Sequence, residues 1–509
     1  MTATERRFAI RSNGVELFVD EENELIFHKN VSVPPKWNGG VLRVNVYQPI
    51  VEGKYPSLVT FHEKPFSEVN PVHKSKYSAW ETPDPVYWTK SPGLLDTMSA
   101  STANSFFDLI EWTAVQDWCN GKVGLLGVSY YAAKRPKGLA AIVPHEGMSD
   151  YYRDRCRHGG ILSNNFIKFW WNRQVNTNQY GRPNRSKSRW GEDTIEGDLD
   201  AAELAQDCRD QNADNAANPF LDDEYHSSKG GNTLHLRGIV EGYTWAGSQH
   251  KFLRFIVGRH DLPFYYDEEV EVEAGWKTGK VPPVSVCLRK GDVGFNDPES
   301  EKTFPRRDEM GWPIARTEYT KFFLTSDLSL KHDGQGIKEA ESSILSCDAG
   351  ESSVKCVKVL HSTTRELGPG SFLTLRHFTA AGKEIPYTGS SGDAVAVTRG
   401  WLRASMRKVH TESPYHRPYL PRREYRSIDV QPVESGVIYE CDVELWPTNV
   451  VVEKGGWLVL QVSSEVTNPG VDLFKHNFPI DRPAEKSSGV NNIHFDNEHE
   501  NYLLLPVIP

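Results

Sequence analysis

The segment Gly121–Tyr130 constrains the fold of this chain more than any other feature. Its apolar residues Val123–Leu126 favour a short buried strand, and they run directly into the turn Gly127-Val128-Ser129. Upstream, Ala103–Trp118 carries apolar residues at intervals of three and four, which is the pattern of an amphipathic helix. A helix, a buried strand and a tight glycine turn in succession predict a parallel sheet covered by helices.

Other short apolar runs extend this prediction on both sides. They are Leu42–Tyr47, Ser57–Phe61, Leu139–Val143, Leu253–Val257 and Val284–Leu288. Runs of this length, bounded by turn residues, are typical of strands. We therefore expect an α/β domain built from residues 1–148 and 229–290.

The remaining residues divide into two parts with different residue patterns. Residues 149–228 show no strand pattern but contain helical windows such as Leu199–Asp210, which predicts a helical insertion. Residues 291–509 contain alternating runs separated by turns, which predicts an all-β sandwich. Its expected strands include Tyr319–Leu324, Phe372–Phe378, Ile438–Leu445 and Trp457–Val462, and we expect Trp401, Trp446 and Trp457 to pack in its core.

The charge of the chain has a local origin. The net charge is −10, yet Gly191–Tyr225 alone holds twelve acidic residues and one basic residue. Just before it, Tyr152–Trp190 holds nine basic residues and one acidic residue. We interpret the two stretches as neutralising each other within the insertion, and we expect no binding to nucleic acid.

Composition limits the compartment and the cofactors. No apolar run is long enough for a membrane helix, and the N-terminus does not resemble a secretory signal. The seven cysteines are scattered and form no CxxC pair, which favours reduced thiols and a cytoplasmic protein. The nearby residues His494, Asp496, Glu498 and His499 are better explained as alternating polar residues than as metal ligands, so we expect neither metal nor cofactor.

Ser129 and His260 are the candidate catalytic residues. A serine on a tight turn after a buried strand is exposed above the sheet edge, where the next helix N-terminus can stabilise an oxyanion. Such a serine needs a base, and His260 follows the expected strand Leu253–Val257 at the edge where active sites of open α/β sheets lie. The sequence neighbour Asp261 is expected to have a structural role in its loop.

Several segments together resemble the cocaine esterase/Xaa-Pro dipeptidyl-peptidase family of serine hydrolases. They include GKVGLLGVSYY, GRHDLPFYY, SPGLLDTMS, DLIEWTAVQDW, RGWLRASMRK and the C-terminal NNIHFDNEHENYLLLPVIP. The resemblance runs over nearly the whole chain. It implies an α/β-hydrolase domain with a doubly wound sheet, a helical cap at 149–228 and a C-terminal jelly-roll sandwich at 291–509.

The resemblance also implies a mechanism. Ser129 would attack an acyl carbonyl, His260 would carry the proton, and the backbone N–H of Tyr130 would supply half of the oxyanion hole. Substrates would be small esters or amides, X-Pro peptides included, with no nucleic acid and no membrane as partner; a homodimer is left open. The cap aromatic residues Phe166, Phe169 and Trp170 are candidates for the substrate pocket, with packing between the cap and the main domain as the alternative.

The sequence departs from the family pattern around this chemistry. No oxyanion-hole tyrosine follows Ser57–Phe61, and His62 is the nearby donor of a similar kind. Only six residues separate Ser129 from Pro136, too few for a full helix. The position expected for the triad aspartate is Gly231, which leaves Glu241 as the nearest downstream carboxylate, or else a solvated helix-end charge.

Two interpretations of these losses stay open. Either the chain is a degenerate paralogue without hydrolase activity, or coding segments were removed from the sequence as introns. The losses are in frame and family-like sequence resumes on both sides of each, which favours the second. Three functions therefore remain: a serine hydrolase, an inactive relative that acts as a binding module, and an acyltransferase that uses the same serine.

Overall fold

The computed structural model describes part of the chain. The described residues are 8–10, 16–21, 24–33, 42–59, 99–128, 135–145, 147, 149–165, 168, 187–188, 191–192, 211–227, 236–259, 281–325, 329–332, 343–347, 370–390, 392–464, 476, 480–483, 491–495 and 499–509. The chain divides into two compact units. The first comprises Met1–Gly147, Lys168–Gln211 and Ser228–Thr233, and the second comprises Met148–Ile167, Asn212–Ser227 and Leu234–Pro509.

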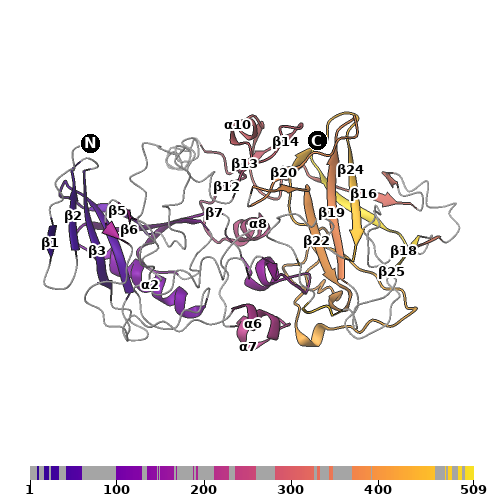
Figure 1. Cartoon of the computed structure of the whole chain (residues 1–509), viewed down its shortest axis with the longest axis horizontal. Coiled ribbons are helices and arrows are strands. Elements are labelled where there is room, and N and C mark those ends of the chain that lie inside the picture. Colours follow the sequence, from indigo (N-terminus) through magenta and orange to yellow (C-terminus); the bar gives the residue numbers. More distant parts are fainter. Residues whose placement is uncertain are drawn as a thin grey trace. The chain divides into compact units, whose positions relative to one another are not determined.

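The first unit contains a parallel sheet and an antiparallel sheet. The parallel sheet has the order β5-β6-β7, and its strands are Tyr55–Val59, Cys119–Val128 and Leu139–His145. The antiparallel sheet runs β1-β2-β3-β4, with strands Phe8–Ile10, Glu16–Asp20, Leu25–Val33 and Leu42–Pro49. The predicted parallel sheet is therefore confirmed in its strands β5 to β7 (Figure 1).

Helix α2, Ala100–Ala114, packs on the parallel sheet. It begins at Ser99, whose Oγ accepts a hydrogen bond from the backbone N–H of Thr102 and so caps the helix. Its apolar residues Phe106, Leu109 and Ile110 lie in one core cluster with Val123 and Leu125 of β6. The three- and four-residue spacing seen in the sequence thus corresponds to the face that α2 buries.

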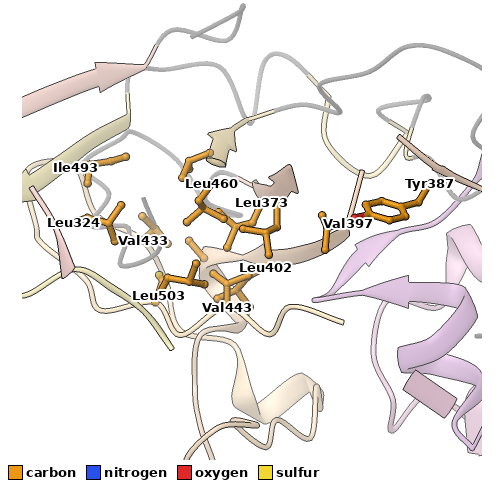
Figure 2. Close-up of a cluster of buried hydrophobic side chains, with 14 of the residues drawn as sticks. Leu324, Leu373, Tyr387, Val397, Leu402, Val433, Val443, Leu460, Ile493 and Leu503 are labelled. Carbon is orange, nitrogen blue, oxygen red and sulfur yellow. The ribbon is translucent and has the colours of Figure 1, made fainter. Parts of the chain in front are cut away.

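Two three-stranded sheets form the main core of the second unit. One has the order β17-β16-β26, with strands Leu330–Lys331, Glu318–Leu324 and Tyr502–Val507. The other has the order β22-β19-β24, with strands Thr398–Arg403, Gly370–Phe378 and Trp457–Ser463. Side chains of both sheets, such as Leu324, Leu373, Leu460 and Leu503, meet in one buried cluster (Figure 2).

Smaller elements complete the described chain. The short helices and turns are a π-helical turn at Tyr152–Cys156, α6 Gln211–Ala217, α7 Glu224–Ser227, α8 Leu236–Trp245, α10 Pro298–Glu301 and 3-10 turns at Ala404–Met406 and Ser427–Asp429. The strand pairs are β8 Arg157–His158 with β9 Ile161–Leu162, β10 Lys187–Ser188 with β11 Gly191–Glu192, β14 Arg289–Lys290 with β23 Val450–Val451, β18 Ser343–Cys347 with β25 Asn491–Phe495, and β20 Tyr387–Thr388 with β21 Ala394–Val395. Strand β13, Val284–Cys287, lies between β12, Leu253–Arg254, and β15, Arg306–Glu309.

Several strand predictions need correction. Ile438–Leu445 is not a strand: it alternates because Cys441 and Val443 are buried in the core, while its described pairing is an isolated bridge between Leu445 and Gly400. Leu253–Val257 is a strand only at β12. Residues 149–228, expected to lack strands, contain the hairpins β8-β9 and β10-β11, the first closed by Gly159 and Gly160 at positive φ.

Among the tryptophans expected in the core, one prediction is wrong. Trp401 is buried, but Trp457 is 40 % exposed and stacks on Phe378. Trp457 lies at the end of β24, which among the described strands pairs with β19. The predicted insertion 149–228 is divided between the two units, and the three-domain boundaries stay a prediction.

Within the described residues, no helix combines the length and apolar character needed to cross a lipid bilayer. The described cysteines Cys119, Cys156, Cys287 and Cys441 are free and buried. No group of three or more potential metal ligands comes together in this described part of the chain.

Candidate active site

The central strand of the parallel sheet ends directly before the candidate nucleophile. β6 pairs with β5 on one side and β7 on the other, and its last residue is Val128. Ser129 and Tyr130 themselves lie outside the described residues. In the sequence, Ser129 directly follows the carboxyl end of this central parallel strand, and ligands of open α/β sheets bind beyond such strand ends.

Close packing fixes the course of β6. A Cβ atom at Gly124 would come within 2.9 Å of Cδ2 of Leu58 on β5. On the other side, Gly127 and Val128 pair with Pro144 and His145 of β7. His145 therefore ends its strand beside the residue that precedes Ser129. No sequence pattern singles out His145, because its place beside Val128 depends on the register of β6 and β7.

The segment that leads to His260 lies within the described residues up to Arg259. β12 pairs in parallel with β13, and the N–H of Phe255 donates to the carbonyl oxygen of Ser285 at 3.0 Å, one residue beyond the strand. Leu253, Phe255 and Val284 are buried in one cluster, and the backbone then turns at Gly258, which has a φ of 146°. His260 lies just beyond, outside the described residues, and stays a prediction.

Glu241, the predicted triad acid, is described on α8. Its Oε2 accepts hydrogen bonds from Nη2 of Arg417 at 2.6 Å and from Nε1 of Trp245 at 3.3 Å. These contacts hold the carboxylate against the 415–419 segment. Whether it serves a catalytic histidine stays a prediction. The other predicted site residues, His62, Phe166, Phe169 and Trp170, lie outside the described residues.

The largest feature that the sequence did not predict is a buried ion network around the π-helical turn. Arg153, Asp154 and Arg157 are all less than a tenth exposed. Arg153 pairs with Asp150 and Glu424, and Arg157 pairs with Asp481. The carboxylates that neutralise Arg153 and Arg157 therefore lie outside the acidic stretch 191–225. For these two arginines, the prediction that the acidic stretch neutralises them is wrong.

Asp154 forms the centre of this network. Its Oδ1 lies 2.6 Å from Nη1 of Arg237 on α8, and Nε of the same arginine lies 2.6 Å from Oε1 of Glu444. Its Oδ2 accepts the backbone N–H groups of Ser149 and Asp150. The network joins the chain around the π-helical turn, α8 and the residues before Trp446. It therefore holds α8, and with it Glu241, in a fixed place within the second unit.

Two family models match the chain. The model described as X-Pro dipeptidyl-peptidase (S15 family) matches residues 88–245, which include Ser129 and Glu241. The model of the X-Pro dipeptidyl-peptidase C-terminal non-catalytic domain matches residues 359–504. Two separate parts of the chain are thus similar to the two domains of X-Pro dipeptidyl-peptidases of the S15 family. His260 lies outside both matched ranges.

Similar proteins agree with this family. Cocaine esterase from Rhodococcus sp. (strain MB1 Bresler) is 29 % identical over 166 residues, which are 28 % of this chain and 27 % of that protein. The chain thus aligns with about a quarter of that curated relative's length. A crystal structure of a CocE/NonD family hydrolase from Staphylococcus aureus matches with a TM-score of 0.72 and 20 % identity, covering 99 % of this chain and 96 % of that one.

A second solved structure, an α-amino acid ester hydrolase, matches with a TM-score of 0.54 and 12 % identity, covering 96 % of this chain and 97 % of that one. At such identities the likeness concerns the fold alone. Together with the family models, it shows an α/β-hydrolase-like fold with a C-terminal β-rich domain.

Proposed function

We propose that this protein is a serine hydrolase that cleaves an ester or an amide through an acyl-enzyme on Ser129. The observation that carries the proposal is the end of the central parallel strand β6 at Val128, one residue before Ser129 and inside the family match. Oγ of Ser129 attacks the acyl carbonyl while His260 takes its proton and passes it to the leaving alcohol or amine. Water then releases the acid and restores the serine.

The rest of the proposed site combines the family pattern with residues particular to this chain. The backbone N–H of Tyr130 donates to the oxyanion, with His62 as a second donor, and Phe166, Phe169 and Trp170 line the acyl pocket. Substrates are small esters or X-Pro peptides, since relatives include cocaine esterase and X-Pro dipeptidyl-peptidases. The jelly-roll topology of the C-terminal domain, a homodimer and a cytoplasmic location belong to the same proposal.

Activity on chromogenic esters and X-Pro anilides tests the proposal. We expect the protein to hydrolyse at least one of the two classes, and we expect Ser129→Ala and His260→Ala each to lower the rate at least a hundredfold. Equal rates for the protein and for Ser129→Ala would contradict the proposal. Adding alcohols or amines as competing acceptors separates hydrolysis from acyl transfer, because an acyltransferase forms new esters or amides from them.

One observation favours an inactive binding protein as the second candidate. The connection from Val128 at the end of β6 to Leu139 at the start of β7 holds ten residues. Parallel neighbours usually need a dozen or more residues, most of them helical. A short connection leaves little helix after Ser129 to stabilise an oxyanion. An inactive relative would be folded yet without activity in either assay.

A further inference from the structure

A group of half-exposed aromatic side chains lies within the second unit. Trp245 is 48 % exposed, Tyr415 is 44 % exposed and Tyr319 is 38 % exposed. The ring centroids of Trp245 and Tyr415 are 4.7 Å apart, and Tyr319 stacks on Tyr419 at 4.3 Å. We call these four residues, with Arg417 and Glu241, the aromatic patch. Exposed apolar rings gathered in this way mark binding surfaces more often than isolated ones.

Arg417 joins the two ring pairs. Its guanidinium carbon lies 5.7 Å from the ring centroid of Trp245 and 5.7 Å from that of Tyr419. Glu241 holds this arginine at 2.6 Å and also accepts from Nε1 of Trp245. The patch is built from the C-terminal half of α8, the 415–419 segment and β16. Since its side chains already hold one another in place, a ligand would bind with little loss of conformational entropy.

The patch carries no net charge. The carboxylate of Glu241 balances the guanidinium of Arg417. The guanidinium carbon of Arg422 lies 5.1 Å from the ring centroid of Tyr415, and Glu424 balances this second arginine. Burial and the neighbouring Tyr419 raise the pKa of Tyr319 above its ordinary value, so its phenol stays neutral at physiological pH. A neutral patch does not attract the phosphates of nucleic acid or a strongly charged peptide. Its ligand should therefore be neutral as well.

The polar atoms of the patch distinguish between two classes of neutral ligand, a proline-rich peptide and a polysaccharide. Both hydrogen bonds to Glu241 use Oε2, and Oε1 accepts none from the described residues. A proline-rich peptide offers carbonyl acceptors but few donors, because proline lacks an N–H group. It would leave this carboxylate oxygen unpaired. Sugar hydroxyls both donate and accept, and the C–H face of a sugar ring can pack on the negative face of an aromatic ring.

We propose that the aromatic patch binds a neutral polysaccharide, whose sugar rings stack on Trp245 and Tyr415 and whose hydroxyl groups bond to Glu241 and Arg417. In this proposal Glu241 serves as a ligand-binding carboxylate, and the binding does not require hydrolase activity at Ser129.

Affinity electrophoresis of the full chain tests the proposal. Native gels would contain one of four soluble neutral polysaccharides, namely a β-glucan, a mannan, a xylan or starch, and poly-L-proline would serve as the competing neutral polymer. We expect retardation by at least one polysaccharide and none by poly-L-proline. Trp245→Ala and Tyr415→Ala should each weaken the binding at least tenfold, because hot spots in interfaces are often Trp and Tyr.

Trp457→Ala is the matched control. Trp457 is similarly exposed, at 40 %, but stacks on Phe378 and is not part of the patch. This control should bind like the unchanged protein, and all variants should unfold at its denaturation midpoint, since the altered rings are half-exposed. The proposal would be overturned if none of the four polysaccharides retarded the protein, or if poly-L-proline alone did. It would also be overturned if Trp245→Ala bound polysaccharide as tightly as the unchanged protein.

Discussion

The carboxylate of Asp154 and the guanidinium of Arg237 form an ion pair of 2.6 Å inside the second unit, where Asp154 is fully buried. Burial raises the pKa of Asp154 and the adjacent Arg237 opposes that rise, while Glu444 and Asp154 hold the pKa of Arg237 well above its ordinary value. The arginine therefore stays charged. It links a segment near residue 150 to α8 and to Glu444, three parts of the chain far apart in sequence.

Removal of one partner from this network should be costly. Arg237→Met leaves the buried carboxylate of Asp154 without its counter-ion, so we expect a loss of about 3–5 kcal/mol in the free energy of unfolding. Urea denaturation measures it. Lys302→Met is the control, because Lys302 and Glu299 form an exposed pair and such pairs contribute about 1 kcal/mol or less. Equal losses for the two variants would show that the network does not stabilise the fold.

The buried histidines next to this network should make stability depend on pH. Nε2 of His158 donates to the carbonyl oxygen of Asp154 at 3.2 Å, so its Nδ1 accepts from Nε2 of His476, also at 3.2 Å. Trp401 and Trp446 each lie 4.8 Å from the ring of His158. Burial, with Arg237 nearby, lowers the pKa of His158 to about 4 and that of His476 well below its ordinary value.

Both histidines are therefore neutral in the folded protein. As the pH falls below about 6.5, the unfolded chain binds protons that folded His158 does not bind, so stability falls until about pH 4. The part due to His158 is about 3 kcal/mol, and above pH 6.5 it contributes no pH dependence. Denaturation midpoints measured from pH 4 to pH 8 test this. His158→Gln should flatten the slope, and an unchanged slope would refute the assignment.

The turn that closes β8-β9 should tolerate no side chain at Gly159. A methyl group there would overlap the carbonyl oxygen of Trp401, and φ is +56°, where L-residues are strained. We expect Gly159→Ala to lower the free energy of unfolding by more than about 2 kcal/mol. Gly242→Ala is the matched control, because nothing lies within 4 Å of the new methyl group on α8. That substitution should stabilise the protein by about 0.5–1 kcal/mol.

Local patterns predicted the elements that have a local cause. The apolar run before Ser129 became β6, and the periodic run Ala103–Trp118 became α2 with its end moved to Ala114. The prediction failed where a residue's role depends on distant partners. Ile438–Leu445 alternates like a strand without a continuous neighbour, and no sequence pattern near Arg157 points to Asp481, more than 300 residues away.

The candidate site was predictable only in part for the same reason. A strand before a glycine turn marks Ser129 locally, whereas the role of Glu241 depends on Arg417, which follows it by 176 residues. The aromatic patch could not be predicted from the sequence either, because Trp245, Tyr319 and Tyr415 come from three separate segments and none of these segments shows a periodic pattern.

The short connection after Ser129 leads to a prediction about the gene product. If coding segments were removed as introns, the mature transcript will encode additional residues between Ser129 and Pro136 and next to Gly231. The mass of the native protein will then exceed the mass calculated for these 509 residues. Sequencing the transcript and measuring the intact mass of the native protein test this. A transcript that encodes these 509 residues alone would instead support a degenerate paralogue.

The central claim is that Ser129 is an activated nucleophile, and an active-site-directed fluorophosphonate tests it most directly. Mass spectrometry of the digested, labelled native protein should find one adduct, on the peptide that contains Ser129, and none in Ser129→Ala or after denaturation before labelling. A folded protein that stays unlabelled, or a label on a different residue, would contradict the account.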